Sequence, residues 1–435
     1  MSLRDRMNRL RGTQPAEQEL VNPKDDDAKL NQPPDEGEDE VEDEELSPAW
    51  APMGVVQRSN AHGSYLVREV RYPLDYVHGH HRLSELAIAA PYLSSFHQGE
   101  QMTEERLLFL DLETTGLGVG AGNVPFMVGI GYCESTEFIV EQTLIRHPAE
   151  ERAMLFDLQE KLKDFRYLVT YNGRTFDWPV MQNRFILSGF GRDIWEPMHI
   201  DFLHPARSIW RNTLASCRLS HVEEERLGIY RKDDVPGSMA PQLYFQYLAE
   251  GNPEPLHGVF LHNGTDMLSL ACLAIRFGHL LSGRLGQYIP LPTEPEELVR
   301  TGLWLERVGA ASIAEPFYEA AAQSTAASAA TLMTLASRDK KVGNWQRAVL
   351  LWQKAVLQRE KYTSSSANEA HIELAMYNEH KLKDYETAYL YAREALERAL
   401  SHPLLSRRDK KRQAEIDALR NRTQRLERKL GRHTS

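Results

Sequence analysis

The sequence has few cysteines and no long uninterrupted apolar run. Its three cysteines, Cys133, Cys217 and Cys272, lie far apart, and no two of them form a C-x-x-C pair. This spacing argues against a disulfide framework and against a cysteine zinc site, and it is typical of a reducing compartment. No apolar run reaches the roughly 18 residues that a membrane-spanning helix requires. We therefore expect no membrane partner.

The first residues, MSLRDRMNRLRG, also lack the apolar segment of a secretory signal peptide. Together with the cysteine pattern, this absence predicts a cytoplasmic protein. With 42% hydrophobic and 26% charged residues, the composition is that of a globular protein. At about 100–200 residues per domain, a chain of 435 residues is expected to form two or three domains.

Charge is distributed unevenly along the chain, whose net charge is -11. Residues 1–50 carry 6 basic and 15 acidic side chains, whereas residues 338–435 carry 22 basic and 13 acidic ones. Because an electrostatic footprint is local, overall acidity does not exclude a polyanionic partner. Residues 1–47 form an acidic segment with several prolines and, from residue 13 on, almost no large apolar side chains, so we predict that it is disordered.

The central part of the chain alternates apolar segments with amphipathic ones. Three strands are expected in succession, in the segments RLLFLDLET, VPFMVGIGYCE and EFIVEQTLI. Helices alternate with two further short strands after them, and the segment LHNGTDMLSLACLAIRFGHLL is expected to form one long helix. This order predicts an α/β domain over residues 48–290, with a mixed sheet flanked by helices.

Beyond about residue 295 the sequence becomes rich in alanine and contains an internal repeat. Small and aromatic residues recur after 34 positions, a period typical of tetratricopeptide repeats. We predict an all-α, tetratricopeptide-like repeat domain over residues 295–435 that ends in a basic helix. Such repeats offer extended surfaces for a protein partner. The repeated positions are Gly309, Ala314, Tyr318 and Ala321, which correspond to Gly343, Ala348, Trp352 and Ala355.

Two acidic residues stand inside the first apolar segment, LLFLDLETTG. In a strand, residues two positions apart face the same side, so Asp111 and Glu113 project together. Like charges side by side repel each other, and a divalent cation compensates them most readily. Taken alone, the pair is better explained as two solvated acids at a strand end.

Two later segments supply further polar residues. In TYNGRTFDWPVMQNR, Asn172 follows an apolar strand and Asp177 falls at the start of a helix. In HNGTDMLSL, His262 and Asp266 are four residues apart and therefore share one face of a helix. The chain thus offers four acids on three expected elements and a histidine beside the last of them.

This arrangement resembles the DEDD superfamily of 3′-to-5′ exonucleases, which have a ribonuclease H-like fold. DLETTG is similar to the first exonuclease motif, NGRTFD to the second and HNGTD to the third, over about residues 105–282. The pattern is most similar to the YprB-type ribonuclease H-like family, which commonly carries tetratricopeptide repeats after the nuclease-like domain. The segments DFLHPAR, SCRLSHVEEERLGI and DDVPG also resemble that family.

The resemblance implies a metal-dependent exonuclease that acts on single-stranded DNA or RNA ends and releases nucleoside 5′-monophosphates. Asp111, Glu113, Asp177 and Asp266 would hold two Mg²⁺ or Mn²⁺ ions, because hard cations prefer oxygen ligands. His262 would be the general base. Its spacing departs from the pattern, since the superfamily places a histidine five residues, or a tyrosine four residues, before the last aspartate.

Substrate contacts are expected from two loops. Thr114, Thr115 and Gly116 are candidates for contacts with the terminal nucleotide, although a plain turn after the strand explains them equally well. Asn172 is a candidate substrate contact or the cap of the following helix, and we expect the cap. Asp201, in DFLHPAR, is expected to cap a helix.

The alternative function is a non-catalytic nucleic-acid-binding or scaffold protein that uses the nuclease-like fold and the helical repeats. The four acids favour the enzyme. The basic segment near the C-terminus, residues 407–432, has two interpretations: a helix that caps the repeats, or one that binds phosphates.

Overall fold

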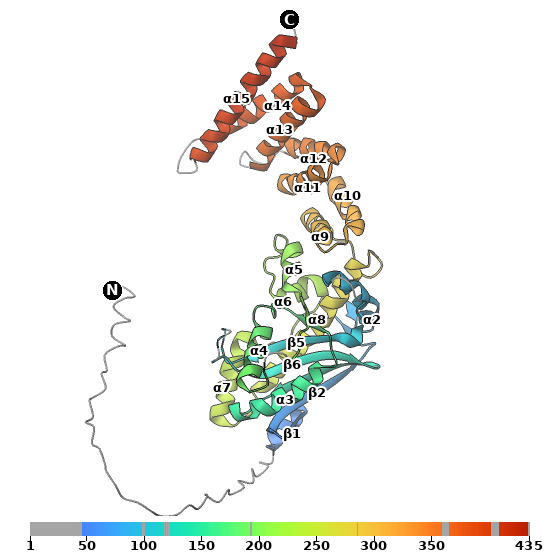
Figure 1. The fold of residues 1–435 in the computed structure, drawn as a ribbon, viewed down its shortest axis with the longest axis vertical. Helices are drawn as coiled ribbons and strands as arrows, with labels where there is room; N and C mark the ends of the chain where they lie inside the picture. The colour runs from blue at the N-terminus through green and yellow to red at the C-terminus, as the bar shows by residue number, and fades with distance from the viewer. Residues whose placement is uncertain are drawn as a thin grey trace, which may run out of the picture. The chain divides into compact units, whose positions relative to one another are not determined.

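The fold is described from a computed structural model (Figure 1). The structure describes residues 46–97, 101–116, 118, 120, 122–191, 194–284, 286–358, 365–401 and 409–433. The predicted disordered segment 1–47 lies outside the described residues, except for its last two.

A seven-stranded mixed sheet forms the centre of the N-terminal part of the described chain, in the order β1-β2-β7-β6-β5-β8-β9. The three apolar segments form strands β5, β6 and β7, as predicted, and these strands pair as an antiparallel meander. Strands β8 and β9 are added parallel to β5 on its other side. The carboxyl ends of β5, β8 and β9 therefore lie at the same edge of the sheet. These strands span Leu107–Thr114 (β5), Pro125–Glu134 (β6), Glu137–Leu144 (β7), Tyr167–Thr170 (β8) and Met198–Asp201 (β9).

A hairpin extends the sheet at its other edge. Strands β1 (Val55–Asn60) and β2 (Gly63–Pro73) pair with each other antiparallel, and β2 also pairs with β7. A second, two-stranded sheet consists of β3 (Val77–His78) and β4 (His81–Arg82). Most residues of β1, VVQRSN, are polar.

The central strand β5 is buried on both faces, which explains its nearly continuous apolar sequence. Leu108, Leu110 and Leu112 belong to one core with residues of α3, α4 and α7, and Leu107 and Phe109 belong to a second core with residues of α5 and α8. Asp111 and Glu113 continue the second register, so they project on the side of Phe109, as predicted. The helices of this part are α2 (Glu85–Ala89), α3 (Glu151–Leu162), α4 (Asp177–Leu187), α5 (Leu203–Trp210), α6 (Leu219–Val222), α7 (Ala240–Glu250) and α8 (Leu256–Leu281).

Helix α8 is the longest helix of this part and packs on β5, β6 and β7. Among the described residues it is the one helix long and apolar enough to cross a membrane, yet 78% of its apolar window is buried inside the fold. This degree of burial is typical of a core helix. Gly129 of β6 permits the close approach of α8, because a Cβ atom there would lie 2.0 Å from Oδ1 of Asn263.

The C-terminal part of the described chain consists of helices. Helices α9 and α10, α11 and α12, and α13 and α14 pack in sequential pairs, and α15 packs on α14. The described part also contains short 3-10 or π segments at Pro48–Met53, Ala90–Phe96, Glu104–Arg106, Pro148–Glu150, Glu223–Leu227, Gly237–Met239, Ala311–Ile313 and Asn378–Leu382. The helices span Pro295–Arg307 (α9), Glu315–Gln323 (α10), Ala329–Val342 (α11), Trp345–Leu357 (α12), Ser365–Tyr377 (α13), Tyr385–Leu400 (α14) and Asp409–His433 (α15).

The residues of the sequence repeat occupy equivalent places in the helix pairs. Ala314 and Ala348 are fully buried near the starts of the second helices of their pairs, as is Ala388 in the third pair. Gly309 and Gly343 have φ values of 84° and 87° in the turns that precede these helices. The corresponding turn of the third pair has Lys383 at φ 60°.

Helix α15 closes this set of helices. Ile416, Leu419 and Leu426 are buried against α13 and α14. Arg425 and Lys429 form ion pairs with Glu379, whose side chain is buried. Part of the positive charge of this helix is therefore used within the protein, which agrees with the capping interpretation.

Candidate active site

The four predicted acids come together beside the carboxyl end of β5. Asp111 and Glu113 lie on β5, Asp177 is the first residue of α4, and Asp266 lies within α8. The exposed fractions of Glu113, Asp177 and Asp266 are only 7%, 5% and 7%. Asp111 is half-buried, so the site that these four acids from three elements share has only limited access to water.

Burial raises the pKa of every acid in this cluster, and repulsion by other members raises the pKa of Asp111, Glu113 and Asp177 further. Burial raises the pKa of Asp111 well above its usual value, and the charges of Asp266, Asp177 and Glu113 raise it further. The pKa of Glu113 is raised in the same way, first by burial and then by the neighbouring aspartates. Burial is also the main reason why the pKa of Asp177 rises from 3.8 to about 7. Full ionisation of the cluster thus requires positive charge nearby.

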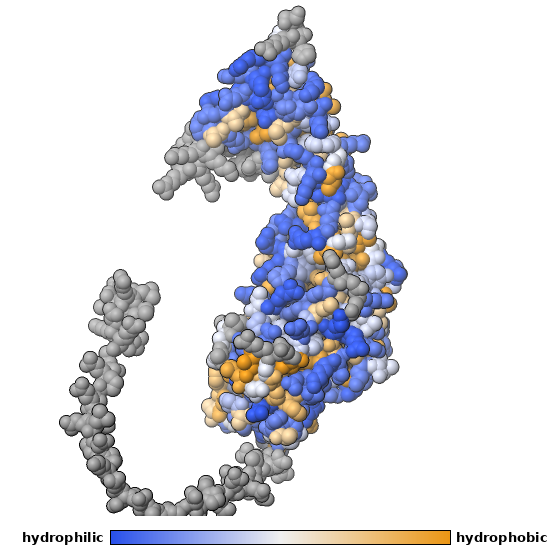
Figure 2. Space-filling model, in the orientation of Figure 1, coloured by the Kyte–Doolittle hydropathy of each residue, from blue (hydrophilic) through white to orange (hydrophobic). Residues whose placement is uncertain are grey.

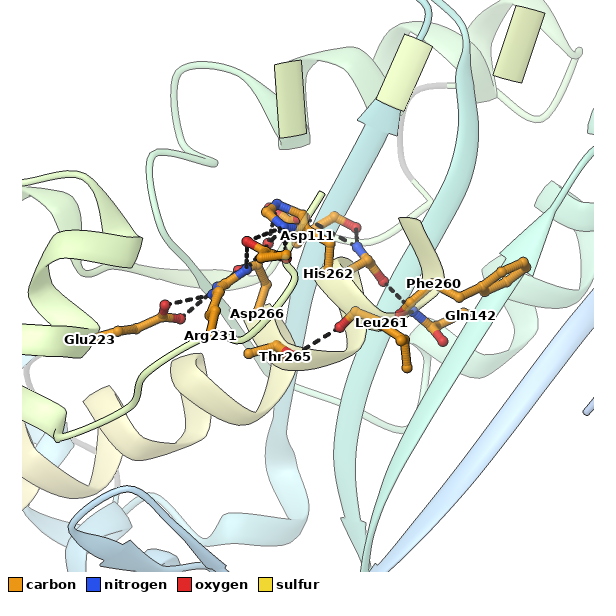
Figure 3. Close-up of polar contacts among 11 residues, drawn as sticks. Asp111, Gln142, Glu223, Arg231, Phe260, Leu261, His262, Thr265 and Asp266 are labelled. Carbon is orange, nitrogen blue, oxygen red and sulfur yellow. Dashed lines mark hydrogen bonds and ion pairs between the residues drawn. The ribbon is translucent and has the colours of Figure 1, made fainter. Parts of the chain in front are cut away.

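Arg231 supplies such a charge, and the sequence analysis did not identify it. Its guanidinium group pairs with Glu223 at 2.6 Å and with Asp266 (Figure 3). Burial disfavours the charged guanidinium, but the contacts with Glu223 and Asp266 outweigh it and raise the pKa of Arg231. Glu223 is fully buried at the start of a π-helical turn, Glu223–Leu227. Arg231 is therefore an internal counterion of Asp266.

His262 lies beside Asp266 with one ring nitrogen toward it. Nε2 of His262 is 3.5 Å from Oδ2 of Asp266, and Nδ1 is 2.9 Å from Oδ1 of Asp234. Nδ1 is also 3.0 Å from Nη1 of Arg231, but one ring nitrogen cannot donate and accept at once. Donation from Nδ1–H to the Asp234 carboxylate leaves Nε2 as the acceptor that faces the acids.

A chain of buried amides holds Asp111. Nδ2 of Asn263 donates to Oδ2 of Asp111 at 3.1 Å, and Nε2 of Gln142 donates to Oδ1 of Asn263 at 2.9 Å. Nη1 of Arg68 in turn donates to Oε1 of Gln142 at 2.7 Å. These contacts fix the orientation of both amide groups. The side chain of Asp111 is therefore positioned by residues on three other elements.

The residues after β5 form hydrogen bonds within the loop that connects β5 to β6. Oγ1 of Thr114 donates to the carbonyl oxygen of Gly116 at 2.6 Å, and Oγ1 of Thr115 accepts from the backbone N–H of Val124 at 3.0 Å. Both hydroxyl groups thus have a role in the turn, which is one of the two interpretations of this segment. Contact of Thr114, Thr115 or Gly116 with a substrate remains a prediction.

The prediction that Asn172 caps a helix is wrong. Helix α4 begins at Asp177, and its N-cap residue, Phe176, makes no capping hydrogen bond through its side chain. Oδ1 of Asn172 instead accepts from Oγ1 of Thr175 at 3.1 Å, within a turn in which Asn172 has a φ of 73°. Six residues separate the end of β8 from α4, and this turn lies among them.

Asp201 at the end of β9 supports both this turn and the next helix. Its carboxylate accepts from the backbone N–H groups of Asn172 at 2.8 Å and Arg174 at 3.1 Å. It also accepts from the N–H of Leu203, the first residue of α5, at 3.0 Å. Phe202, not Asp201, is the N-cap residue of α5, but this contact still provides a partner for one N–H group at the start of the helix. The larger role of Asp201, however, is to hold the loop that leads to α4.

The four carboxylates fit a divalent cation in their chemistry. All are oxygen donors of the kind that Mg²⁺ and Mn²⁺ prefer, and a cation would oppose the rise in pKa that burial causes at each of them. In the part of the chain that the structure describes, however, no three acid, histidine or cysteine side chains converge closely enough to hold an ion. Asp266 is engaged by Arg231 instead. For Asp266 to bind a metal ion together with the other acids, its carboxylate would have to rotate away from Arg231.

The raised pKa of Asp177 predicts a pH-dependent stability in the absence of metal. The folded state binds this proton more tightly than the unfolded state, so stability is highest at low pH and falls as pH rises toward about 7. Asp177→Asn should remove this loss and raise the free energy of unfolding by about one to a few kcal/mol at ~pH 8. The gain should shrink toward ~pH 5.

Urea unfolding with a chelator, at several pH values, measures this difference. Asp157→Asn is the control, because Asp157 accepts a hydrogen bond from Tyr65 in another part of the domain. An Asp177→Asn gain that is absent at ~pH 8, or equal at both pH values, would contradict the charge repulsion inferred here.

Comparison with known proteins agrees with this architecture. The RNase_H superfamily matches residues 108–277, which extend from β5 to α8 and include all four acids. The fold and this match define a ribonuclease H-like domain, a mixed sheet flanked by helices, as predicted.

A longer match comes from one relative. The chain is 34% identical over 344 residues to the "Uncharacterized protein YprB" of Bacillus subtilis (strain 168), and the alignment covers 76% of this chain and 80% of that protein. The chain therefore belongs to the YprB family of the RNase_H superfamily. The predicted membership of the YprB-type family is confirmed.

Proposed function

We propose that this protein is a metal-dependent 3′-to-5′ exonuclease that hydrolyses single-stranded DNA or RNA ends. Membership of the RNase_H superfamily suggests nuclease activity in general terms. The observation that carries the finer proposal is the cluster of Asp111, Glu113, Asp177 and Asp266, in which the charges of the other three acids raise the pKa of Asp111 and those of Asp177 and Asp266 raise the pKa of Glu113. A chain gains nothing in stability from such a cluster, so a cationic ligand is its natural explanation.

In this proposal Asp111, Glu113, Asp177 and Asp266 hold two Mg²⁺ or Mn²⁺ ions. Such ions activate a water and stabilise the leaving 3′ oxygen. The amide of Asn263 orients the carboxylate of Asp111 toward this site. Arg231 pairs with both Asp266 and Glu223, so it would keep a partner in Glu223 if Asp266 turned toward the ions.

His262 is the proposed general base. Asp234 accepts from Nδ1–H and so sets the tautomer in which Nε2 can take a proton on the side of the acids. The spacing of four residues from Asp266 is compatible with this role, because the two side chains already face each other in α8. The histidine therefore needs no change in the helix to reach the cluster.

Replacement of His262 by alanine should lower the hydrolysis rate by about 10²–10⁴ and remove the low-pH limb of the rate profile. Asp234→Asn should lower the rate less, because it disturbs only the orientation of the ring. His262→Tyr tests whether a tyrosine at this spacing restores activity. Pre-steady-state rates over a range of pH measure all three. A His262→Ala rate close to that of the wild type would place the base elsewhere.

The C-terminal helices are proposed to be tetratricopeptide-like repeats that bind a protein partner. The buried alanines at equivalent places in three helix pairs support this assignment. The positive-φ turns at Gly309, Gly343 and Lys383 support it as well. A cytoplasmic location is proposed from the sequence alone.

One observation favours a second function, a non-catalytic nucleic-acid-binding or scaffold protein. Within the described residues no ready-made ion-binding set exists, and Arg231 already compensates Asp266. The two functions differ in their response to metal. An enzyme with this site should show a rise in Tm that grows with Mn²⁺ concentration, whereas a scaffold should show little change.

The proposed function is tested with 5′- and 3′-end-labelled single-stranded and duplex DNA and RNA, in Mg²⁺, Mn²⁺ or a chelator. The expected result is metal-dependent shortening of single strands from the 3′ end, with nucleoside 5′-monophosphates as products. Internal cleavage would correct the proposal to an endonuclease. Absence of cleavage of every substrate would refute it.

A further inference from the structure

A surface cavity of about 520 Å³ lies between the end of β8 and helix α5. The residues that follow β8 form one wall, and α5 and the segment after it form the others. The hydroxyl group of Tyr171 donates to the carbonyl oxygen of Cys217 at 2.6 Å, which ties the first wall to the last. The polar residues that line the cavity are Tyr171, Asn172, Arg207, Arg211, Ser216 and Arg218.

The cavity has positive charge that the protein does not use. Arg207, Arg211 and Arg218 are exposed, and no acidic side chain lines the cavity. Across the described ranges, none of the three guanidinium groups has an ion-pair or hydrogen-bond partner, in contrast to Arg231 and Arg425. Hydrophilic residues cover the surface over α5 and α6, whereas apolar ones gather over α4 and α7 (Figure 2). Three unpaired arginines around one cavity are suited to an anion with several phosphate groups.

The cavity adjoins the carboxylate cluster through one loop. Asn172 lines the cavity, and its backbone N–H is held by Asp201. The negative charge of Asp201 also contributes to the raised pKa of Asp177, after burial, so these two acids are neighbours. The loop from Asn172 to Asp177 therefore runs from the wall of the cavity to the proposed site of hydrolysis.

We propose that this arginine cavity binds backbone phosphates of the nucleic-acid strand whose end is hydrolysed at the carboxylate cluster. The proposal rests on the proposed function for the identity of the strand. Guanidinium groups bind phosphate oxygens through paired hydrogen bonds, and a backbone presents one phosphate per nucleotide. The charge of Arg207, Arg211 and Arg218 thus holds the strand while the acids act on its end.

The first test measures strand binding by the full chain without hydrolysis. Fluorescence anisotropy with a short labelled poly(dT) or poly(U) strand, in a chelator, compares the wild type with the variant Arg207→Ala/Arg211→Ala/Arg218→Ala. We expect a loss of at least ~10-fold in affinity at low salt. The slope of log affinity against log salt should become shallower by about 2, at about 0.7 per phosphate contact.

The control removes two exposed arginines elsewhere, Arg152 and Arg284, and should leave the slope unchanged. Lysine at the three cavity positions should retain most of the slope, because the charge remains. Circular dichroism verifies that every variant is folded. Equal affinity and slope in the cavity variant and the wild type would overturn the proposal, as would equal losses in the cavity and control variants.

A second test separates this proposal from the proposed function. The p-nitrophenyl ester of thymidine 5′-monophosphate is a phosphodiester too small to reach both sites. With Mn²⁺, the cavity variant should cleave it at the wild-type rate. If the wild type binds strands through the arginines but cleaves neither strand nor ester, the exonuclease proposal fails and the binding site stands. If thymidine 5′-monophosphate displaces the strand as well as an unlabelled strand does, the cavity holds a single nucleotide and the proposal is overturned.

Discussion

Replacement of Asp111 by asparagine is expected to lower the rate of strand hydrolysis by about 10³-fold or more. Asp111 is the acid whose pKa is raised by the charges of all three others, so its carboxylate experiences repulsion from every other member of the cluster. Asparagine keeps the shape and can still pair with Asn263, but it removes one anionic ligand. The rate of release from a 3′-labelled strand in Mn²⁺ measures the effect.

The fold of this variant should be unharmed. Removing one of several repelling carboxylates should leave Tm in a chelator equal to or above that of the wild type. Asp157→Asn, remote from the cluster, should hydrolyse at the wild-type rate. If Asp111→Asn retains activity within a few-fold of the wild type, these carboxylates do not carry out the reaction.

Replacement of Arg231 by methionine should destabilise the metal-free protein by about 3–5 kcal/mol. Arg231 is the counterion of Glu223, which is fully buried, and of Asp266, which is 7% exposed. Loss of one member of a buried ion pair leaves the remaining charge without compensation. Urea unfolding in a chelator measures the loss.

Two further variants test the cause. Glu223→Gln added to Arg231→Met should restore part of the lost stability, and Arg231→Lys should lose less than methionine. Mn²⁺ should reduce the difference between wild type and Arg231→Met, because a bound cation compensates Asp266. An unchanged free energy of unfolding in Arg231→Met would show that the ion pair contributes nothing to the fold. Asp266→Asn also breaks this pair, so Asp111→Asn is the cleaner test of the acids.

The elements that carry the four acids could be predicted from local sequence. Alternation in a strand places Asp111 beside Glu113, an apolar run followed by polar residues predicts the start of a helix near Asp177, and helical spacing places His262 beside Asp266. Each of these relations involves residues close together in the chain. The spacing of neighbouring residues in the sequence is therefore enough to predict them.

The partners of these residues could not be predicted in the same way. Arg231 and Asp234 lie in an irregular segment after a π-helical turn, and nothing periodic indicates which way they point. Gln142 reaches Asn263 across 121 residues of sequence, through the packing of α8 on the sheet. The capping role of Asn172 was predicted wrongly because the helix begins five residues later. Long-range packing decides these contacts.

The most direct measurement of the central claim is the binding of Mn²⁺ to the intact protein by isothermal titration calorimetry. The wild type should bind about two ions per chain in a saturable manner, and Asp111→Asn and Glu113→Gln should lose at least one of them while remaining folded. Absence of saturable binding by the wild type, or binding by both variants identical to that of the wild type, would contradict the assignment of these carboxylates as a metal site.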